Sequence, residues 1–154
     1  MNNYTAQQVT LGRAFINTIL AAFNTRPAGA LVVTPKLRLS NNPALVFTPD
    51  TTIATLASAE CAYSGYTAGG IAATVSAPLD LSTVCQGVFI QGLFEATPAS
   101  PFVPDTATGW WLDDGTNFLV GEKFSGNQTA PFGVPGNFLA LNATIPVQLN
   151  QGTS

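Results

Sequence analysis

At 154 residues the chain fits one domain, which is large enough to bury a core without metal ions or disulfides. Only 8% of its residues are charged, against roughly 25% in an average soluble domain, while 46% are hydrophobic. The net charge of −3 and the wide spacing of the five cations exclude the basic groove of a nucleic-acid-binding protein, so no nucleic-acid partner is expected.

A surface with so few charges is weakly solvated, which indicates that other subunits cover much of it. The alternative is a small neutral domain whose surface is built from threonine, serine and asparagine. No apolar run is long enough to span a bilayer, and the N-terminus lacks the pattern of a secretory signal. We therefore expect no membrane partner and synthesis in a reducing compartment.

The first part of the chain predicts one α-helix over residues 6–24. Thr5 and Gln8 match a capping box, in which each side chain satisfies a backbone N–H group. Apolar residues then recur at steps of three and four until Pro27 ends the helix. We expect residues 1–26 to form a helical anchor, with three side chains buried under the sheet or at a subunit interface: Ile16, Leu20 and Phe23.

Beyond this helix, residues 27–154 are predicted to form one β domain, because short β-rich runs alternate with turns. In one run Lys36 and Arg38 alternate with leucines, which indicates a solvated edge strand. Residues 51–56 are predicted as another short strand. The fold class expected is mainly β, an antiparallel β-sandwich or jelly-roll-like barrel with the one N-terminal α-helix.

A hairpin is the clearest local signal in this domain. The run Asp113-Asp114-Gly115-Thr116 lies between two apolar segments, and Asp-Gly in that position is typical of a tight β-turn. Gly115 is therefore predicted at positive φ, where glycine has no steric cost. Residues 138–149 alternate apolar and polar side chains, as a half-buried closing strand does.

Residues suited to catalysis are scarce. The chain has no histidine, which removes the usual general base and the commonest metal ligand. Of eight carboxylates only Asp113 and Asp114 are adjacent, and in a turn we expect both to cap backbone N–H groups. The glycines form neither a phosphate-binding loop nor a dinucleotide fingerprint. We therefore expect that the protein is not an enzyme and binds no cofactor or metal. The alternative left open is a glycosidase-type catalytic pair of carboxylates from distant strands.

Two pairs of residues leave alternatives open. Cys61 and Cys85 have no zinc-site spacing and are expected to be buried as small hydrophobic residues, or to pair if adjacent strands bring them together. Trp110 and Trp111 are adjacent in a strand, so their rings should face opposite sides of the sheet. One should fill the core. For the other we favour an interface with a partner over an exposed platform for sugar.

Two stretches resemble small structural proteins of tailed bacteriophages and prophages. The first covers residues 36–66, KLRLSNNPALVFTPDTTIATLASAECAYSGY, with a Leu-x-Leu strand, a Thr-Pro-Asp-Thr turn and a closing Ser-Gly-Tyr. The second covers residues 109–124, GWWLDDGTNFLVGEKF, a Gly-aromatic-aromatic hairpin followed by a Glu-x-Phe strand. The predicted helix and residues 125–154 lie outside this resemblance.

The resemblance implies a virion component that is made in the host bacterial cytoplasm. A capsid decoration (cement) protein suits it best, stabilising the phage shell by adhesive contacts. Its expected partners are copies of itself, with a homotrimer favoured, and the major capsid protein or another virion protein. The alternative is a tail, baseplate or fibre-associated structural protein, or a carbohydrate-binding attachment protein.

Overall fold

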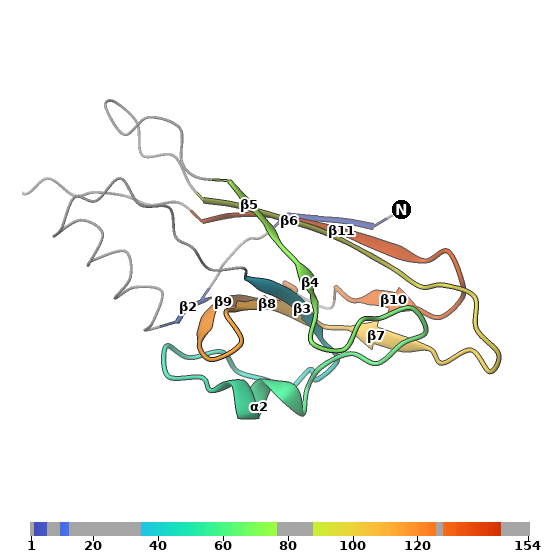
Figure 1. Cartoon of the computed structure of the whole chain (residues 1–154), viewed down its shortest axis with the longest axis horizontal. Helices are drawn as coiled ribbons and strands as arrows, with labels where there is room; N and C mark the ends of the chain where they lie inside the picture. Colours follow the sequence, from blue (N-terminus) through green and yellow to red (C-terminus); the bar gives the residue numbers. More distant parts are fainter. Residues whose placement is uncertain (1, 6–9, 13–34, 77–87, 126–127, 146–154) are drawn as a thin grey trace, which may run out of the picture.

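The computed structural model describes residues 2–5, 10–12, 35–76, 88–125 and 128–145 (Figure 1). This part of the chain is mainly β, with largely antiparallel sheets and one short helix, which confirms the expected fold class at that level. The anchor side chains Ile16, Leu20 and Phe23, and also Cys85, lie outside the described residues. None of the helices in the described ranges has both the length and the hydropathy required to span a bilayer.

The first sheet has four strands. In spatial order they are β1 (Asn2–Thr5), β11 (Phe138–Ile145), β6 (Val88–Glu95) and β5 (Thr74–Ser76). The two long central strands, β11 and β6, pair antiparallel along their whole length. β1 instead runs parallel to β11 at the edge, so the start of the chain lies beside its last described strand.

The second sheet has five strands. In spatial order they are β2 (Thr10–Leu11), β9 (Phe118–Lys123), β8 (Gly109–Asp113), β3 (Lys36–Ser40) and β4 (Ile71–Ala72). A separate ribbon pairs β7 (Asp105–Ala107) with β10 (Ala130–Phe132). β3 is thus an inner strand and not the solvated edge that its two cations indicated.

The N-terminal prediction needs a correction where the structure describes it. Thr10 and Leu11 pair with β9 as a strand, although the predicted helix of residues 6–24 included both. Gly12 follows directly, and a Cβ atom there would lie 1.9 Å from the carbonyl oxygen of Phe118. Because the backbone approaches β9 so closely, only glycine fits at this position.

One core cluster draws on both large sheets. Leu37 and Trp110 come from the five-stranded sheet, and Ile90 and Leu141 come from the four-stranded sheet. All four side chains are fully buried. Side chains alternate between the two faces of a strand, so Trp111 must point away from this core.

A second, smaller cluster covers the opposite face of the five-stranded sheet. Trp111 and Phe118 pack there against Leu45 and Leu56, both from the segment that contains α2 (Ile53–Ala57). Trp111 is therefore fully buried by its own chain. The cover that we expected from a partner comes from residues 41–59, and neither tryptophan leaves side-chain surface free for an interface.

The short helix replaces a predicted strand. Residues 51–56 were expected to be extended, but α2 begins after Thr52, whose hydroxyl accepts a hydrogen bond from the Thr55 backbone N–H at 3.3 Å. This N-cap satisfies one of the free donors in the first turn. Burial of Leu56 then fixes the helix against the sheet.

Candidate functional site

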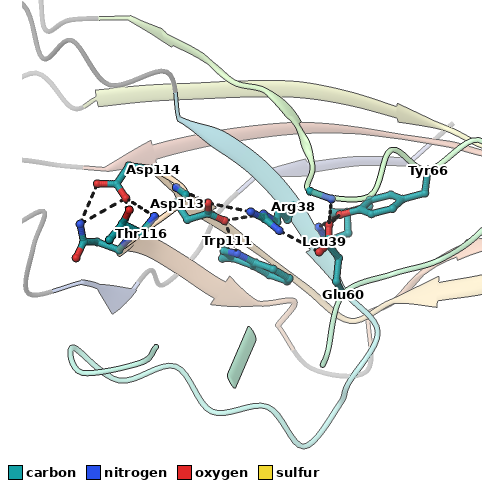
Figure 2. Close-up of polar contacts among 11 residues, drawn as sticks. Arg38, Leu39, Glu60, Tyr66, Trp111, Asp113, Asp114 and Thr116 are labelled. Atoms are coloured by element: carbon teal, nitrogen blue, oxygen red, sulfur yellow. Dashed lines mark hydrogen bonds and ion pairs between the residues drawn. The ribbon is translucent and has the colours of Figure 1, made fainter. Parts of the chain in front are cut away.

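Among the described residues, the charged side chains gather most closely in an ion network centred on Arg38 (Figure 2). Arg38 lies in the middle of β3, and its guanidinium contacts Asp113 at the end of β8 and Glu60 beside β3. Nη1 donates to Glu60 Oε2 at 3.0 Å, and Nη2 donates to Asp113 Oδ1 at 3.1 Å. Nε lies 2.7 Å from Asp113 Oδ2, an ion-pair contact whose angle does not make a hydrogen bond.

Asp113 is the most deeply buried member of the network, with 0% of its side chain exposed. Besides Arg38 it accepts hydrogen bonds from Trp111 Nε1 and from the Gly115 backbone N–H, both at 2.9 Å. A carboxylate without water needs such donors, because an unpaired buried charge is very costly. The prediction that Asp113 only caps the turn is therefore wrong: it caps Gly115 and also neutralises the partly buried Arg38.

Glu60 occupies the other side of Arg38. Its Oε1 accepts from the Tyr66 hydroxyl and from the Gly69 backbone N–H, each at 2.9 Å. The same hydroxyl accepts from the Leu39 backbone N–H at 3.2 Å. Burial, reinforced by the charge of Glu60, raises the pKa of Tyr66, so its hydroxyl stays protonated as a donor. The network thus reaches from the β8–β9 hairpin to the loop at residues 66–69 (Figure 2).

The charge on Arg38 is secure in this environment. Burial lowers the pKa of Arg38, but hydrogen bonds and charges from Asp113 and Glu60 outweigh it and raise the pKa above its usual value. Arginine on its own is already protonated at all physiological pH values. The network therefore has no proton to give or take at Arg38 and acts as a fixed cross-link.

The adjacent Asp114 behaves as the turn residue that the sequence predicted. Its Oδ1 accepts from the backbone N–H groups of Thr116 at 2.8 Å and Asn117 at 2.6 Å. Burial opposes its ionisation, but these hydrogen bonds outweigh it and lower the pKa of Asp114. Gly115 has φ of +88°, and β8 pairs antiparallel with β9, so the predicted hairpin is confirmed.

A second polar group lies around Asp105, at the start of β7. Its carboxylate accepts from the Ala62 backbone N–H at 2.8 Å and from the Asn41 side-chain amide at 3.1 Å. Cys61 is buried nearby, and that burial raises the pKa of its thiol. The buried hydroxyl of Tyr63 has no hydrogen-bond partner among the described residues. Its ring stacks on Phe132 with centroids 3.9 Å apart.

The polar groups around Arg38 and Asp105 fit a structural role better than a catalytic one. Two carboxylates do converge, Glu60 and Asp113, but they converge on one guanidinium and not on an open space. Because Asp113 has no exposed surface, it cannot touch a substrate in this structure. In the described ranges no group of three or more Cys, Asp and Glu side chains is placed to hold a metal ion.

Sequence reasoning missed the network because its members are far apart in the chain. Arg38 and Asp113 are separated by 75 positions, and the pairing of β3 with β8 alone brings them together. The usable signal was an arginine between two leucines in a short β-rich run. Comparison with models of protein families, with curated proteins and with solved structures finds no match to this chain.

Proposed function

We propose that this chain is a structural protein of a tailed-bacteriophage particle, specifically a trimeric capsid decoration protein. One observation carries the proposal. The two stretches that resemble phage structural proteins, residues 36–66 and 109–124, pack against each other and share the ion network. Arg38 and Glu60 come from the first stretch, and Asp113 comes from the second. The resemblance therefore falls on one packed structural unit.

The network supports an adhesive role by making this unit rigid. A buried ion pair adds little net stability, but it penalises any arrangement that separates its members. Here it holds the hairpin, an inner strand and the 66–69 loop in one arrangement. A rigid surface loses little conformational entropy on binding, which favours tight adhesion between protein subunits. The shell would then be stabilised by mass action on the assembled state.

The same proposal includes a β-sandwich architecture of the jelly-roll-like kind. The four-stranded and five-stranded sheets supply opposite walls of the main core cluster, which supports two packed layers. The protein would lie in the virion after synthesis in the bacterial cytoplasm. Because β1 and β2 are strands of the two sheets, residues 1–26 would not form an anchor separate from the β domain. The carbohydrate-binding alternative loses its proposed platform, because both Trp110 and Trp111 are fully buried.

Copy number in purified particles tests the proposal. Particles from a strain that encodes the chain would be digested, and its peptides quantified by mass spectrometry against those of the major capsid protein. A decoration protein is expected at a copy number of the same order as the shell subunit. A few copies per particle would favour the tail or baseplate alternative instead. Absence from intact particles would refute a virion role altogether.

A further inference from the structure

The turn between β8 and β9 contains a link at which the backbone can rearrange without any enzyme. Asp114 is the only Asp or Asn of the chain that is followed by glycine. At such a link the backbone nitrogen of the glycine can attack the side-chain carboxyl carbon of the preceding residue, because glycine has no side chain to block the approach. Gly115 and Thr116 are exposed, so water also reaches this link.

The rearrangement has two steps and needs no reactant except water. In the first step a bond forms between the Gly115 nitrogen and Cγ of Asp114. The nitrogen loses its proton and the protonated carboxyl group loses its hydroxyl, which leave together as one water, and a five-membered succinimide ring remains. In the second step water breaks a C–N bond of the ring. Cleavage at the backbone carbonyl gives isoaspartate, in which the chain runs through Cγ and the mass equals that of aspartate.

The native turn holds the Asp114 carboxylate in place. Oδ1 accepts from the backbone N–H groups of Thr116 at 2.8 Å and Asn117 at 2.6 Å, and Oδ2 accepts from the Asn117 side-chain amide at 3.1 Å (Figure 2). These bonds fix the side-chain torsions, so Cγ can move onto the Gly115 nitrogen only if they break. Burial opposes ionisation of Asp114, but the same bonds outweigh it and lower its pKa, so little of the protonated form that loses water is present at neutral pH.

The attacking nitrogen is held as well. The Gly115 N–H donates to Asp113 Oδ1 at 2.9 Å, and the Asp113 side chain has no exposed surface. Asp113 is also paired with Arg38 and accepts from Trp111 Nε1, which makes its carboxylate a weak base. The Gly115 nitrogen therefore keeps its proton in the folded turn.

We propose that the Asp114–Gly115 link is a latent site of isoaspartate formation, protected in the native turn by the hydrogen bonds of Asp113 and Asp114. Rearrangement would add one carbon to the backbone of the turn and remove the carboxylate that caps Thr116 and Asn117. Because the added carbon is not removed when the turn closes again, each opening of the turn carries a risk of permanent damage to the hairpin. This inference does not depend on the proposed function.

The test compares the full chain, folded and unfolded in guanidinium chloride, at one neutral pH and one temperature. Isoaspartate at position 114 would be quantified over time by mass spectrometry of the digested chain, with electron-transfer fragmentation to distinguish it from aspartate. An opening free energy of about 1.4 kcal/mol already slows a reaction of the open turn about tenfold. Two backbone N–H groups must leave one carboxylate here, so we expect formation in the folded chain to be slower by at least about tenfold.

Two controls separate protection by the turn from other effects. Asp105 precedes Thr106, whose side chain hinders the attack, so it should stay unchanged in both samples. Asn117→Ala removes the side-chain amide bond to Asp114 and should speed formation in the folded chain, but not in guanidinium chloride. Circular dichroism reports whether this variant folds.

Three results would overturn the inference. Absence of isoaspartate at position 114 in the unfolded chain would show that the link is not reactive. Equal rates in the folded and unfolded wild type would show that the native turn gives no protection. An Asn117→Ala variant that folds and reacts as slowly as the wild type would show that the bonds of Asp114 are not its source.

Discussion

Replacing Asp113 with asparagine should destabilise the fold far more than the same change at Asp114. Asparagine matches aspartate in shape but has one acceptor oxygen and an NH2 group in place of two oxygens. At position 113 three donors converge on those two oxygens: Arg38 Nη2, Trp111 Nε1 and the Gly115 N–H. Whichever oxygen becomes NH2 will therefore face a donor, and the charge that balances Arg38 is lost.

The size of this effect follows from burial. Removing one partner of a buried ion pair costs about 3–5 kcal/mol, because the other charge is left uncompensated. Glu60 still pairs with Arg38 in the variant, so we expect the lower half of that range, about 3–4 kcal/mol. Native domains are stable by only about 5–15 kcal/mol, so such a loss would remove much of the total.

The adjacent Asp114 provides the matched control. A single oxygen, Oδ1, accepts both backbone N–H groups there, and the amide oxygen of asparagine can do the same. Asp114→Asn should therefore cost no more than about 1 kcal/mol. Urea unfolding of the wild type and both variants would measure the two differences from the transition midpoints, provided that the slopes agree. Equal losses for the two variants would refute the view that Asp113 is part of a buried ion network.

Three further predictions use pairs of similar residues or a change of pH. Tyr66→Phe should cost about 1–3 kcal/mol because it removes two partly buried hydrogen bonds. Tyr63→Phe should instead be neutral or stabilising, because that hydroxyl has no partner in the described structure. Equal costs in urea unfolding would contradict this. Gly115→Ala should cost about 1–2 kcal/mol, because its backbone has a positive φ. Gly133→Ala should cost little, because its φ is not positive and an added Cβ would meet no other atom within 4 Å. Calorimetry of both variants would compare the two costs. Finally, the lowered pKa of Asp114 stabilises the fold above its unfolded value of 3.8, and this contribution should disappear as the pH falls through the lower folded-state pKa. A stability advantage of the wild type over Asp114→Asn that persists unchanged in stronger acid would count against it.

Local patterns predicted the parts of the fold that local forces decide. The Asp-Gly turn predicted both the β8–β9 hairpin and the positive φ of Gly115, because only the turn geometry matters there. Alternation predicted the strand that begins at Phe138, which the structure describes as far as Ile145. The strand predicted for residues 51–56 was wrong, because local signals there favour two different structures. Its threonines favour strands, but one of them is placed to cap a helix whose Leu56 is buried.

The sequence did not predict the candidate site, because the site is built from contacts between residues that are far apart in the chain. Arg38 was interpreted as an edge cation because its spacing fits one face of a strand, and spacing does not reveal which strand lies next to it. Pairing with β8 on one side and β4 on the other makes β3 an inner strand, and the pairing with β8 brings Asp113 to the guanidinium. In the same way, Trp111 was expected to need a partner, since the sequence did not show that residues 41–59 fold back over it.

Cryo-electron microscopy of intact particles from an encoding strain tests the central claim most directly. If the chain is a capsid decoration protein, the reconstruction should contain density on the shell, at junctions between capsomers, that accommodates the two large sheets and the α2 segment. Density for the chain only in the tail or baseplate would contradict the decoration role and favour the alternative. A complete reconstruction in which every part is assigned to other proteins would contradict the virion role itself.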